Sequence, residues 1–377
     1  MRPFIKWAGG KTQLLNVIKL LMPESYGTYY EPFLGGGALL LDILPKVAYV
    51  NDINSELINV YNQIKSDPKA VGTFLGGLDM IHNNHADPKE FYTKIRTQYN
   101  NDLGAGTAEQ AAKFIYLNKH CFNGLYRVNS KGEFNVPFNG KVTGLSCLTS
   151  QLEETAAAIR RYSFTAVDFE EVCRTAKAGD FVFFDSPYAP LTPTSFTDYT
   201  KEGFAYEDHV RLAALFKQLT ARGVYCLLTN HNTELIRKLY ADFKYVVVSV
   251  NRNINSDADN RSGEEVIILN YDTPNFDVVK KTYSQILEAR KTAASVTAAD
   301  EPVKETKPKQ TRTRKKTAKP KTAAEPTTTE TKLDETVTEP EFKPEENTTS
   351  SVAEEFAVAD AETSAVSKEE DSDAAIE

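Results

Sequence analysis

Apolar residues occur in short blocks over the first 270 positions, and glycine, proline or charged residues separate these blocks. The spacing of Leu, Val and Ile over Thr12–Leu21 predicts a helix that Pro23 ends, and Thr28–Phe33 is typical of a buried strand. A glycine turn follows, then an apolar helix at Ala38–Leu44 and a second strand at Lys46–Val50. This order of strand, glycine turn, helix and strand predicts the opening of an α/β sheet.

The rest of the patterned region predicts a return to strands after a long helical stretch. The segment 54–120 is mainly helical in pattern, and several short apolar runs follow it. The later elements are expected as strands at Phe181–Phe184 and Val224–Thr229, helices at His209–Ala221 and Glu234–Tyr240, and a closing antiparallel pair at Tyr245–Val250 and Glu265–Asn270.

The composition changes near residue 290. Residues 301–377 contain 12 Lys and Arg and 19 Asp and Glu, a net charge of −7, against −1 for residues 1–300. A segment with so few large apolar side chains cannot bury enough surface to offset the entropy lost on ordering, so a disordered charged tail is expected over 291–377. Its first part, 301–322, is basic, and serves either as solvated chain or as an arm that contacts phosphates.

Several classes of protein are excluded. The chain has no run of 18 apolar residues that could cross a membrane, and its N-terminus has no apolar leader. The four cysteines form no CxxC pair and the five histidines no spaced cluster, so no metal site is expected and the thiols are expected to be reduced and mostly buried. The acidic balance belongs mainly to the tail and does not exclude nucleic-acid binding by the folded part.

Two glycine-containing motifs lie near the N-terminus. Glu31–Gly37 (EPFLGGG) is either a tight structural turn or a loop whose backbone approaches a ligand, and Asp52, at the end of the next strand, is placed to bind ribose hydroxyls. Together they predict an adenosine-containing cofactor. Lys6–Thr12 (KWAGGKT) is not a phosphate-binding P-loop, because Ile5 occupies a required glycine position. Trp7 is the single tryptophan, and filling the hydrophobic core is as good an interpretation of it as a role in a binding site.

Two further motifs carry polar groups beyond strand ends. Asp185–Tyr188 (DSPY) follows an apolar strand; it is either a capped turn or a site where an acid and an aromatic ring hold a flat, nitrogenous base. Asn118–Phe138 contains a plausible hairpin whose arms flank Asn129–Gly132, with Arg127 near the tip. A hairpin can enter a DNA groove and arginine pairs with guanine, although an ordinary surface hairpin fits as well. Asn232 is expected to cap the following helix.

Taken together and in this order, the motifs resemble those of the Dam-type DNA adenine-N6 methyltransferases, the D12 class of alpha-class amino-methyltransferases. The match covers most of residues 1–272: the motifs in chain order are KWAGGK, EPFLGGG, DIN from Asp52, NGL with Arg127 and GEFNVPF in the hairpin, DSPY, and the closing strand Val266–Tyr271. Each motif alone is weak, whereas the ordered combination is specific.

The resemblance implies a Rossmann-like S-adenosylmethionine-dependent methyltransferase sheet with an inserted, mostly helical DNA-recognition domain. The implied divisions are residues 1–53 and 166–285 for the catalytic domain and 54–165 for target recognition, with the hairpin at 124–138. It also implies S-adenosylmethionine as cofactor, double-stranded DNA as substrate with GATC as target, and no metal. A cytoplasmic monomer in a bacterial cell or a phage-infected host cell is expected.

The resemblance assigns roles to individual residues. The catalytic group comprises Asp185, Ser186, Pro187 and Tyr188. The cofactor group comprises Trp7, Ala8, Gly9, Lys11, Glu31, Phe33, Gly35, Gly37 and Asp52. The DNA group comprises Lys6, Phe122, Asn123, Leu125, Arg127 and Pro137, with Phe122 stacking near a flipped-out base.

One departure from the family concerns the catalytic motif, because Ser186 stands where the family usually has proline. Serine keeps the backbone carbonyl but is expected to loosen the turn. An alternative is therefore a catalytically weakened or inactive DNA-binding protein of the same fold. Methylation of cytosine N4 or of a small molecule is a third alternative, and the hairpin argues against a small molecule.

Overall fold

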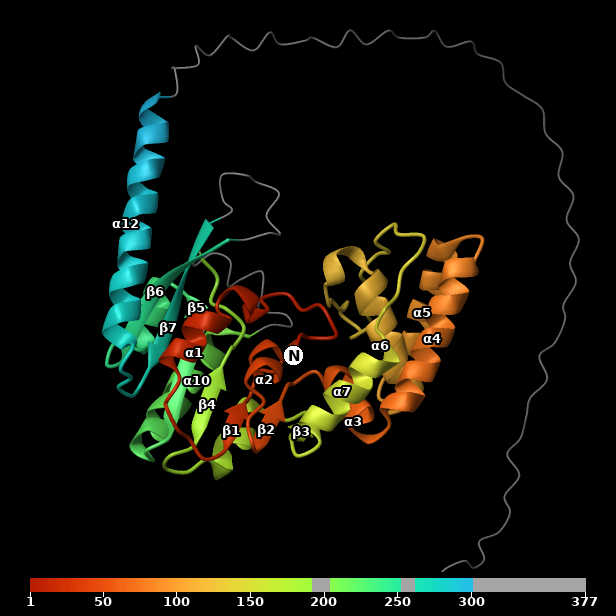
Figure 1. Ribbon diagram of the computed structural model, residues 1–377, viewed down its shortest axis with the longest axis horizontal. Helices are drawn as coiled ribbons and strands as arrows, with labels where there is room; N and C mark the ends of the chain where they lie inside the picture. Colours follow the sequence, from red (N-terminus) through yellow and green to blue (C-terminus); the bar gives the residue numbers. More distant parts are fainter. Residues whose placement is uncertain (192–203, 252–261, 301–377) are drawn as a thin grey trace, which may run out of the picture. The chain divides into compact units, whose positions relative to one another are not determined.

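A mixed seven-stranded sheet forms the centre of the computed structural model, which describes residues 1–191, 204–251 and 262–300 (Figure 1). The strand order is β3-β2-β1-β4-β5-β7-β6; the first five strands run parallel, and β7 pairs antiparallel with both β5 and β6. The strands are β1 (Tyr29–Glu31), β2 (Ala48–Asn51), β3 (Ser163–Thr165), β4 (Phe181–Phe184), β5 (Tyr225–His231), β6 (Lys244–Asn251) and β7 (Ser262–Leu269). The α/β sheet and its closing antiparallel pair confirm the prediction from the sequence.

Helices connect the strands at positions close to those predicted. They are η1 (Lys11–Gln13), α1 (Leu15–Leu21), α2 (Ala38–Ile43), α8 (Phe169–Val172), η3 (Cys173–Thr175), α10 (Tyr206–Ala221), α11 (Glu234–Leu239) and α12 (Phe276–Asp300). The helix predicted over Thr12–Leu21 is divided at Leu14 into η1 and α1. α10 begins three residues before the predicted His209, because Asp208 accepts a hydrogen bond from the backbone N–H of Ala205 (2.9 Å).

Strand β4 separates two hydrophobic cores. Phe181 and Phe183 pack into the core beneath α1, α2 and α3, whereas Val182 and Phe184 pack into the core beneath α8 and α10. Successive side chains of a strand point to opposite faces, so an unbroken apolar run is what a strand covered on both sides requires. This pattern places β4, and the polar residues that follow it, at the middle of the sheet.

Five helices lie between β2 and β3 in the sequence: α3 (Ser55–Ser66), α4 (Pro68–Asn84), α5 (Pro88–Asn101), α6 (Ala108–His120) and α7 (Thr149–Ile159). Asp67 and Asp87 each accept hydrogen bonds from the first turn of the next helix, and proline occupies the first helical position after both. α6 contacts α3, α4 and α5 (Figure 1). The mainly helical character predicted for 54–120 is therefore confirmed.

The C-terminal helix extends further than composition suggests. The disordered tail is expected from residue 291, whereas α12 continues to Asp300. Its first turns pack on β6 and α1, and Phe276 and Val279 are buried there. Residues 301–377, which carry most of the predicted tail, lie outside the described residues.

The side chain of Asn51 connects the polar ends of neighbouring strands. Its Nδ2 donates to the carbonyls of Pro32 (3.1 Å) and Val167 (2.9 Å), and its Oδ1 accepts from the N–H of Val167 (2.9 Å) and from Thr165 Oγ1 (2.9 Å). Asn51 is 1% exposed, so its own amide depends on these four bonds for its partners. The residue therefore holds the glycine turn after β1 against the loop after β3.

Replacing Asn51 with leucine, which has a similar volume, should lower the free energy of unfolding by about 3 kcal/mol, because several buried backbone groups lose their partner. Guanidinium denaturation followed by circular dichroism would measure this. The matched control is Asn101→Leu at the exposed end of α5, which should change stability by less than about 0.5 kcal/mol. Equal effects of the two substitutions would contradict the role assigned to Asn51.

Candidate active site

Three carboxylates lie at one edge of the sheet. Glu31 ends β1, Asp52 follows β2 and Asp185 follows β4. The carboxyl ends of parallel strands meet at the same edge, and β2, β1 and β4 are neighbours in the sheet. The fold thus brings together acids that are separated by up to 154 positions in the sequence.

The glycine turn after β1 is bound to the acid after β2. Asp52 Oδ2 accepts a hydrogen bond from the N–H of Gly35 (2.9 Å), and its Oδ1 accepts from the N–H of Asn54 (3.0 Å). Gly35 has a φ of 50°, in the left-handed region that favours glycine, and a Cβ at this residue would lie 2.7 Å from the Trp7 indole. Glycine is therefore required both by the backbone angle and by the close approach of Trp7.

Lys11 connects the N-terminal motif to the catalytic motif. Its Nζ lies 2.6 Å from Asp185 Oδ1 and donates a hydrogen bond to the carbonyl of Gly9 (2.6 Å). The same ammonium group lies 4.6 Å from the centre of the Tyr188 ring. The Lys11 side chain is only 6% exposed, so the ion pair is protected from water, whereas Asp185 is partly open. Thr229 Oγ1 donates a further hydrogen bond to Asp185 Oδ1 (2.8 Å).

The turn after Asp185 is held by the buried side chain of Asn230 on β5. Asn230 Oδ1 accepts hydrogen bonds from the N–H groups of Ala189 (2.9 Å) and His231 (2.8 Å). These two bonds define the orientation of the amide, so its Nδ2 faces Ser186 Oγ and donates to it at 3.3 Å. Ser186 is 2% exposed. A hydrogen bond to Asn230 therefore restrains the turn at the position where the family usually has proline.

Two contacts restrain Tyr188, one through its hydroxyl and one through its ring. Its hydroxyl donates to Glu265 Oε2 on β7 (2.8 Å), and its ring packs edge-on against His231 at a centroid distance of 4.8 Å. His231 Nδ1 in turn lies 2.7 Å from the carbonyl of Ala189. The aromatic ring of the DSPY motif is thereby held beside Lys11 and Asp185.

The site favours positive charge. Burial raises the pKa of Glu31 well above its ordinary range, and the negative charges of Asp185 and Asp52 raise it further. Burial also raises the pKa of Asp52 and of Asp185, and the charge of Lys11 opposes the shift of Asp185. A cationic partner would lower the pKa of these buried carboxyl groups, because a nearby positive charge stabilises their ionised form.

The hairpin predicted after α6 is present, although its arms pair only at isolated positions rather than as continuous strands. Bridges join Val128 to Phe134 and Cys121 to Phe138, and the N–H of Gly132 donates to the carbonyl of Asn129 (2.9 Å) across the tip. Arg127 Nε donates to Asn135 Oδ1 on the opposite arm (2.7 Å). Arg127 is exposed near the tip, as its predicted role requires.

Lys6 lies against the base of this hairpin through Asn118 on α6. The Asn118 side chain accepts from the N–H of Lys6 and donates to its carbonyl, both at 2.8 Å, and also donates to the carbonyl of Gly124 (3.3 Å). Gly124 has a φ of 65°, and a Cβ there would lie 2.5 Å from the Lys6 side chain. Trp7 stacks on Tyr126 of the hairpin with centroids 5.5 Å apart.

The structure therefore brings the predicted residues into two groups that residues 6–11 connect. The cofactor and catalytic groups meet at the strand ends. Within these groups, Ala8, Gly9 and Pro187 are exposed. Phe33 packs away from the other members, against Phe169 and Phe204. The DNA group lies at the hairpin, where Phe122 (52% exposed), Asn123 and Pro137 are exposed and Leu125 is partly buried.

Several site residues escaped the sequence analysis, although one signal could have found some of them. Thr229 and Asn230 end the strand adjacent to β4, so the rule that ligands bind at strand ends points to them. Asn118 gives no such signal, because its partner Lys6 is 112 positions away. The capping role expected for Asn232 is wrong: Thr233 accepts from the N–H of Ile236 (3.3 Å) at the start of α11, while Asn232 bonds Glu264 and Arg237.

Comparison with known proteins decides the family. Residues 7–254 match the family model described as D12 class N6 adenine-specific DNA methyltransferase. The chain belongs to this family.

Relatives of this D12-class methyltransferase include type II methyltransferases of Lactococcus lactis subsp. cremoris and Methanocaldococcus jannaschii, which are 40% and 38% identical to it. The aligned regions cover 72% of this chain in both cases, and 96% and 99% of the relatives. The DNA adenine methylase of Escherichia coli (strain K12) is 33% identical over 72% of this chain and 95% of its own length.

This D12-class methyltransferase is an adenine-specific DNA methyltransferase. Within the described residues, no helix is long and apolar enough to cross a membrane. The same part of the chain contains no group of three or more His, Cys, Asp or Glu residues arranged to bind a metal ion. The four cysteines are free thiols; three are buried and Cys147 is partly exposed.

Lys11→Met should move the acidic limb of the pH–activity profile of this methyltransferase to higher pH. Burial already raises the pKa of Asp185 and Lys11 opposes that shift, so removing the cation raises this pKa further and protonates the carboxylate at a higher pH. Initial rates of methyl transfer, measured across the acidic and neutral range, would show the change. Lys19→Met, which removes a surface pair with Asp42, is the control and should leave the profile in place. An unmoved acidic limb in Lys11→Met would contradict the coupling.

Proposed function

We propose that the enzyme transfers a methyl group from S-adenosylmethionine to N6 of a flipped-out adenine in double-stranded DNA, with GATC as its recognition site. The observation that supports the chemistry is the arrangement of Asp185, Lys11 and Tyr188 beside the glycine turn at the carboxyl ends of β1 and β4. The printed names of the relatives, which include DNA adenine methylases, support adenine in DNA as the substrate.

The residues at the strand ends suit S-adenosylmethionine. Burial raises the pKa of Glu31 and of Asp52, and the sulfonium cation of the cofactor would stabilise the ionised form of these two carboxyl groups. The cofactor, when bound, supplies a methyl group on positively charged sulfur that a nitrogen lone pair can attack. Asp52 is placed to accept hydrogen bonds from ribose hydroxyls, while its bonds to Gly35 and Asn54 keep its carboxylate in position. Trp7 orders the pocket by packing on the glycine turn.

The catalytic turn suits an adenine amino group. That group is a weak nucleophile, because its lone pair is delocalised into the ring, and it can be reached only when the base leaves the stack. Asp185 and the carbonyl of Ser186 accept the two N6 hydrogens, which localises the lone pair on nitrogen, and Tyr188 stacks on the base. Lys11 keeps Asp185 ionised and hence able to accept. Catalysis then rests on positioning and electrostatic preorganisation.

The hairpin is proposed to read the recognition site. Lys6, Leu125, Arg127 and Pro137 contact base edges in this proposal, and the exposed ring of Phe122 occupies the space next to the flipped base. The GATC assignment rests on the resemblance of residues 123–138 to the Dam-type hairpin, and among the relatives both DNA adenine methylases and type II methyltransferases occur. The recognition sequence is therefore the part of the proposal that most needs a direct test.

Plasmid DNA without adenine methylation, treated with the enzyme and S-adenosylmethionine, should become resistant to a nuclease that methylated GATC blocks and sensitive to one that requires it. Asp185→Ala should abolish both effects, because N6 loses its main acceptor, while S-adenosylmethionine binding measured by calorimetry persists.

Sequencing of modified bases in the same DNA separates the remaining outcomes. Methylated adenine at another sequence would overturn GATC and keep the reaction, whereas DNA without any modified adenine would overturn the proposed activity.

Ser186 tests whether a hydrogen bond replaces proline in the catalytic turn. Ser186→Ala should lower kcat by about fivefold, because the buried Asn230 Nδ2 loses its acceptor and the turn is released. Ser186→Pro should stay within about threefold of the original enzyme, because the proline ring itself restrains the backbone. Single-turnover rates at saturating cofactor would measure both. A different outcome is that the unmodified enzyme is inactive and the Ser186→Pro variant is active. That result would favour the alternative in which this chain is a catalytically weakened DNA-binding protein.

A further inference from the structure

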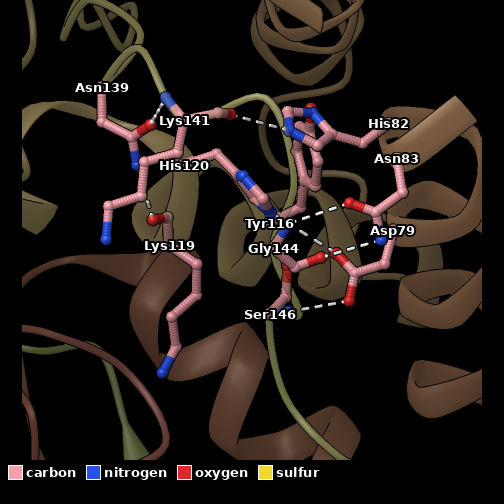
Figure 2. Close-up of polar contacts among 10 residues, drawn as sticks. All are labelled: Asp79, His82, Asn83, Tyr116, Lys119, His120, Asn139, Lys141, Gly144 and Ser146. Carbon is pink, nitrogen blue, oxygen red and sulfur yellow. Dashed lines mark hydrogen bonds and ion pairs between the residues drawn. The ribbon is translucent and has the colours of Figure 1, made fainter. Parts of the chain in front are cut away.

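Three polar side chains on α4, two of them buried and one exposed, face the chain that leaves the hairpin. The side chains are Asp79, His82 and Asn83, and they contact the exit segment, residues 139–146, which follows the hairpin (Figure 2). Asp79 and His82 are at most 3% exposed. Burying a polar group costs free energy unless the group forms a hydrogen bond, so the partners of each side chain in this row matter.

Asp79 binds the end of the exit segment. Its Oδ2 accepts a hydrogen bond from the N–H of Ser146 (2.8 Å), and its Oδ1 accepts from Ser146 Oγ (2.5 Å). His120 Nε2, at the last residue of α6, lies 3.5 Å from the same Oδ1 (Figure 2). One carboxylate thus holds both the backbone and the side chain of Ser146 against two helices.

His82 binds the middle of the exit segment and the base of the hairpin. Its Nε2 lies 3.2 Å from the carbonyl of Lys141 and its Nδ1 lies 2.8 Å from the Tyr116 hydroxyl. A carbonyl can only accept, so Nε2 carries the proton, and Nδ1 of the neutral ring accepts from the tyrosine. The His82 ring also packs against Phe138 with centroids 5.8 Å apart.

Asn83 binds the exit segment between these two points. Its side chain donates to the carbonyl of Gly144 (3.0 Å) and accepts from the N–H of Gly144 (2.8 Å). A Cβ on Gly144 would lie 3.0 Å from His120 Cε1, so the segment passes close to the imidazole ring. The α4 row therefore holds Lys141, Gly144 and Ser146 in turn.

Helix α5 holds the return arm of the hairpin, residues 133–138, in the same way. Asn100 exchanges two hydrogen bonds with the backbone of Phe134 (2.9 and 3.1 Å), and the Tyr92 hydroxyl donates to the carbonyl of Val136 (2.8 Å). Pro137 lies between these contacts and those of the α4 row. Its carbonyl also accepts from the N–H of Phe122 on the other arm (2.8 Å).

We propose that Asp79, His82 and Asn83 are positioning residues for sequence recognition, which hold the exit segment and, together with the α5 contacts to the return arm, fix the place of Pro137 and of the Asn135 that binds Arg127. The proposal rests on the proposed base-reading role of the hairpin. The exit segment carries exposed apolar side chains, Val142 and Leu145, so little apolar burial holds it in place. Its position therefore depends on polar contacts: those of the α4 row, and those of Asn139, whose N–H donates to the carbonyl of His120 (2.9 Å) and whose side chain donates to the carbonyl of Lys119 (3.2 Å).

The test compares Ser146→Ala and Asp79→Asn with Thr155→Val in the full-length enzyme. Ser146→Ala removes one hydroxyl, and Asp79→Asn places an amide N–H₂ against one of the two Ser146 donors. Thr155 is a fully buried residue on α7 whose hydroxyl bonds its own helix at Gln151 (2.8 Å), so Thr155→Val matches the loss of a buried hydroxyl without touching the exit segment.

Three quantities are measured below the melting temperature of each variant. The first is the ratio of kcat/KM for the recognition site, as identified by sequencing the methylated DNA, to that for a duplex with one base pair changed. The second is the affinity for S-adenosylmethionine. The third is hydrogen exchange of the backbone N–H groups of Gly144 and Ser146.

Ser146→Ala and Asp79→Asn should each lower the discrimination ratio by roughly tenfold, which lies within the range that one good base contact supplies. They should raise KM for the recognition site more than they lower kcat, and they should speed exchange at Gly144 and Ser146. S-adenosylmethionine affinity should stay within about twofold, and Thr155→Val should change only the melting temperature.

An unchanged discrimination ratio despite faster exchange would overturn the proposal and leave the row a purely structural feature. Unchanged exchange would overturn it as well, because the contacts would not hold the segment. If the unmodified enzyme methylated no adenine, the proposed function would fail by itself; the ratio of dissociation constants for the two duplexes would then decide the positioning role.

Discussion

The buried ion pair between Lys11 and Asp185 is the contact on which the site depends. Lys11 comes from the N-terminal segment and Asp185 follows the central strand β4, so this 2.6 Å contact joins the N-terminal segment to the DSPY turn. A buried charge that lost its partner would be strongly destabilising. Burial raises the pKa of Asp185, and the charge of Lys11 opposes this shift and so favours the ionised carboxylate.

The same N-terminal segment also carries the contacts to the recognition hairpin. Lys6 is bound by Asn118, and Trp7 packs on the glycine turn on one side and on Tyr126 on the other. Residues 6–11 are therefore a short covalent connection between the hairpin, which is proposed to read DNA, and the DSPY turn, which is proposed to hold the target base.

The DSPY motif shows how a departure from a family pattern is accommodated. Proline would restrain the turn covalently, whereas Ser186 is restrained by a hydrogen bond from Asn230, whose orientation Ala189 and His231 define. The loosening expected from the sequence is therefore opposed by a residue on the neighbouring strand. Since Asn230 is fully buried, competition from water does not weaken this contact.

Local patterns in the sequence determined every strand except the short β3, most helices and the order of the motifs, because hydrophobic periodicity and turn residues act over a few positions. They also determined that Glu31 lies in a strand and that Asp52 and Asp185 follow strands, and the rule for parallel sheets placed these acids at one edge. Only the tertiary structure decided which side chains hold them: Asn118 reaches Lys6 across 112 positions, Asp79 reaches Ser146 across 67, and Asn230 reaches Ser186 across 44. Such contacts leave no periodic signal, because a buried polar residue is placed by the partner that satisfies it, and that partner is brought near only when the chain has folded.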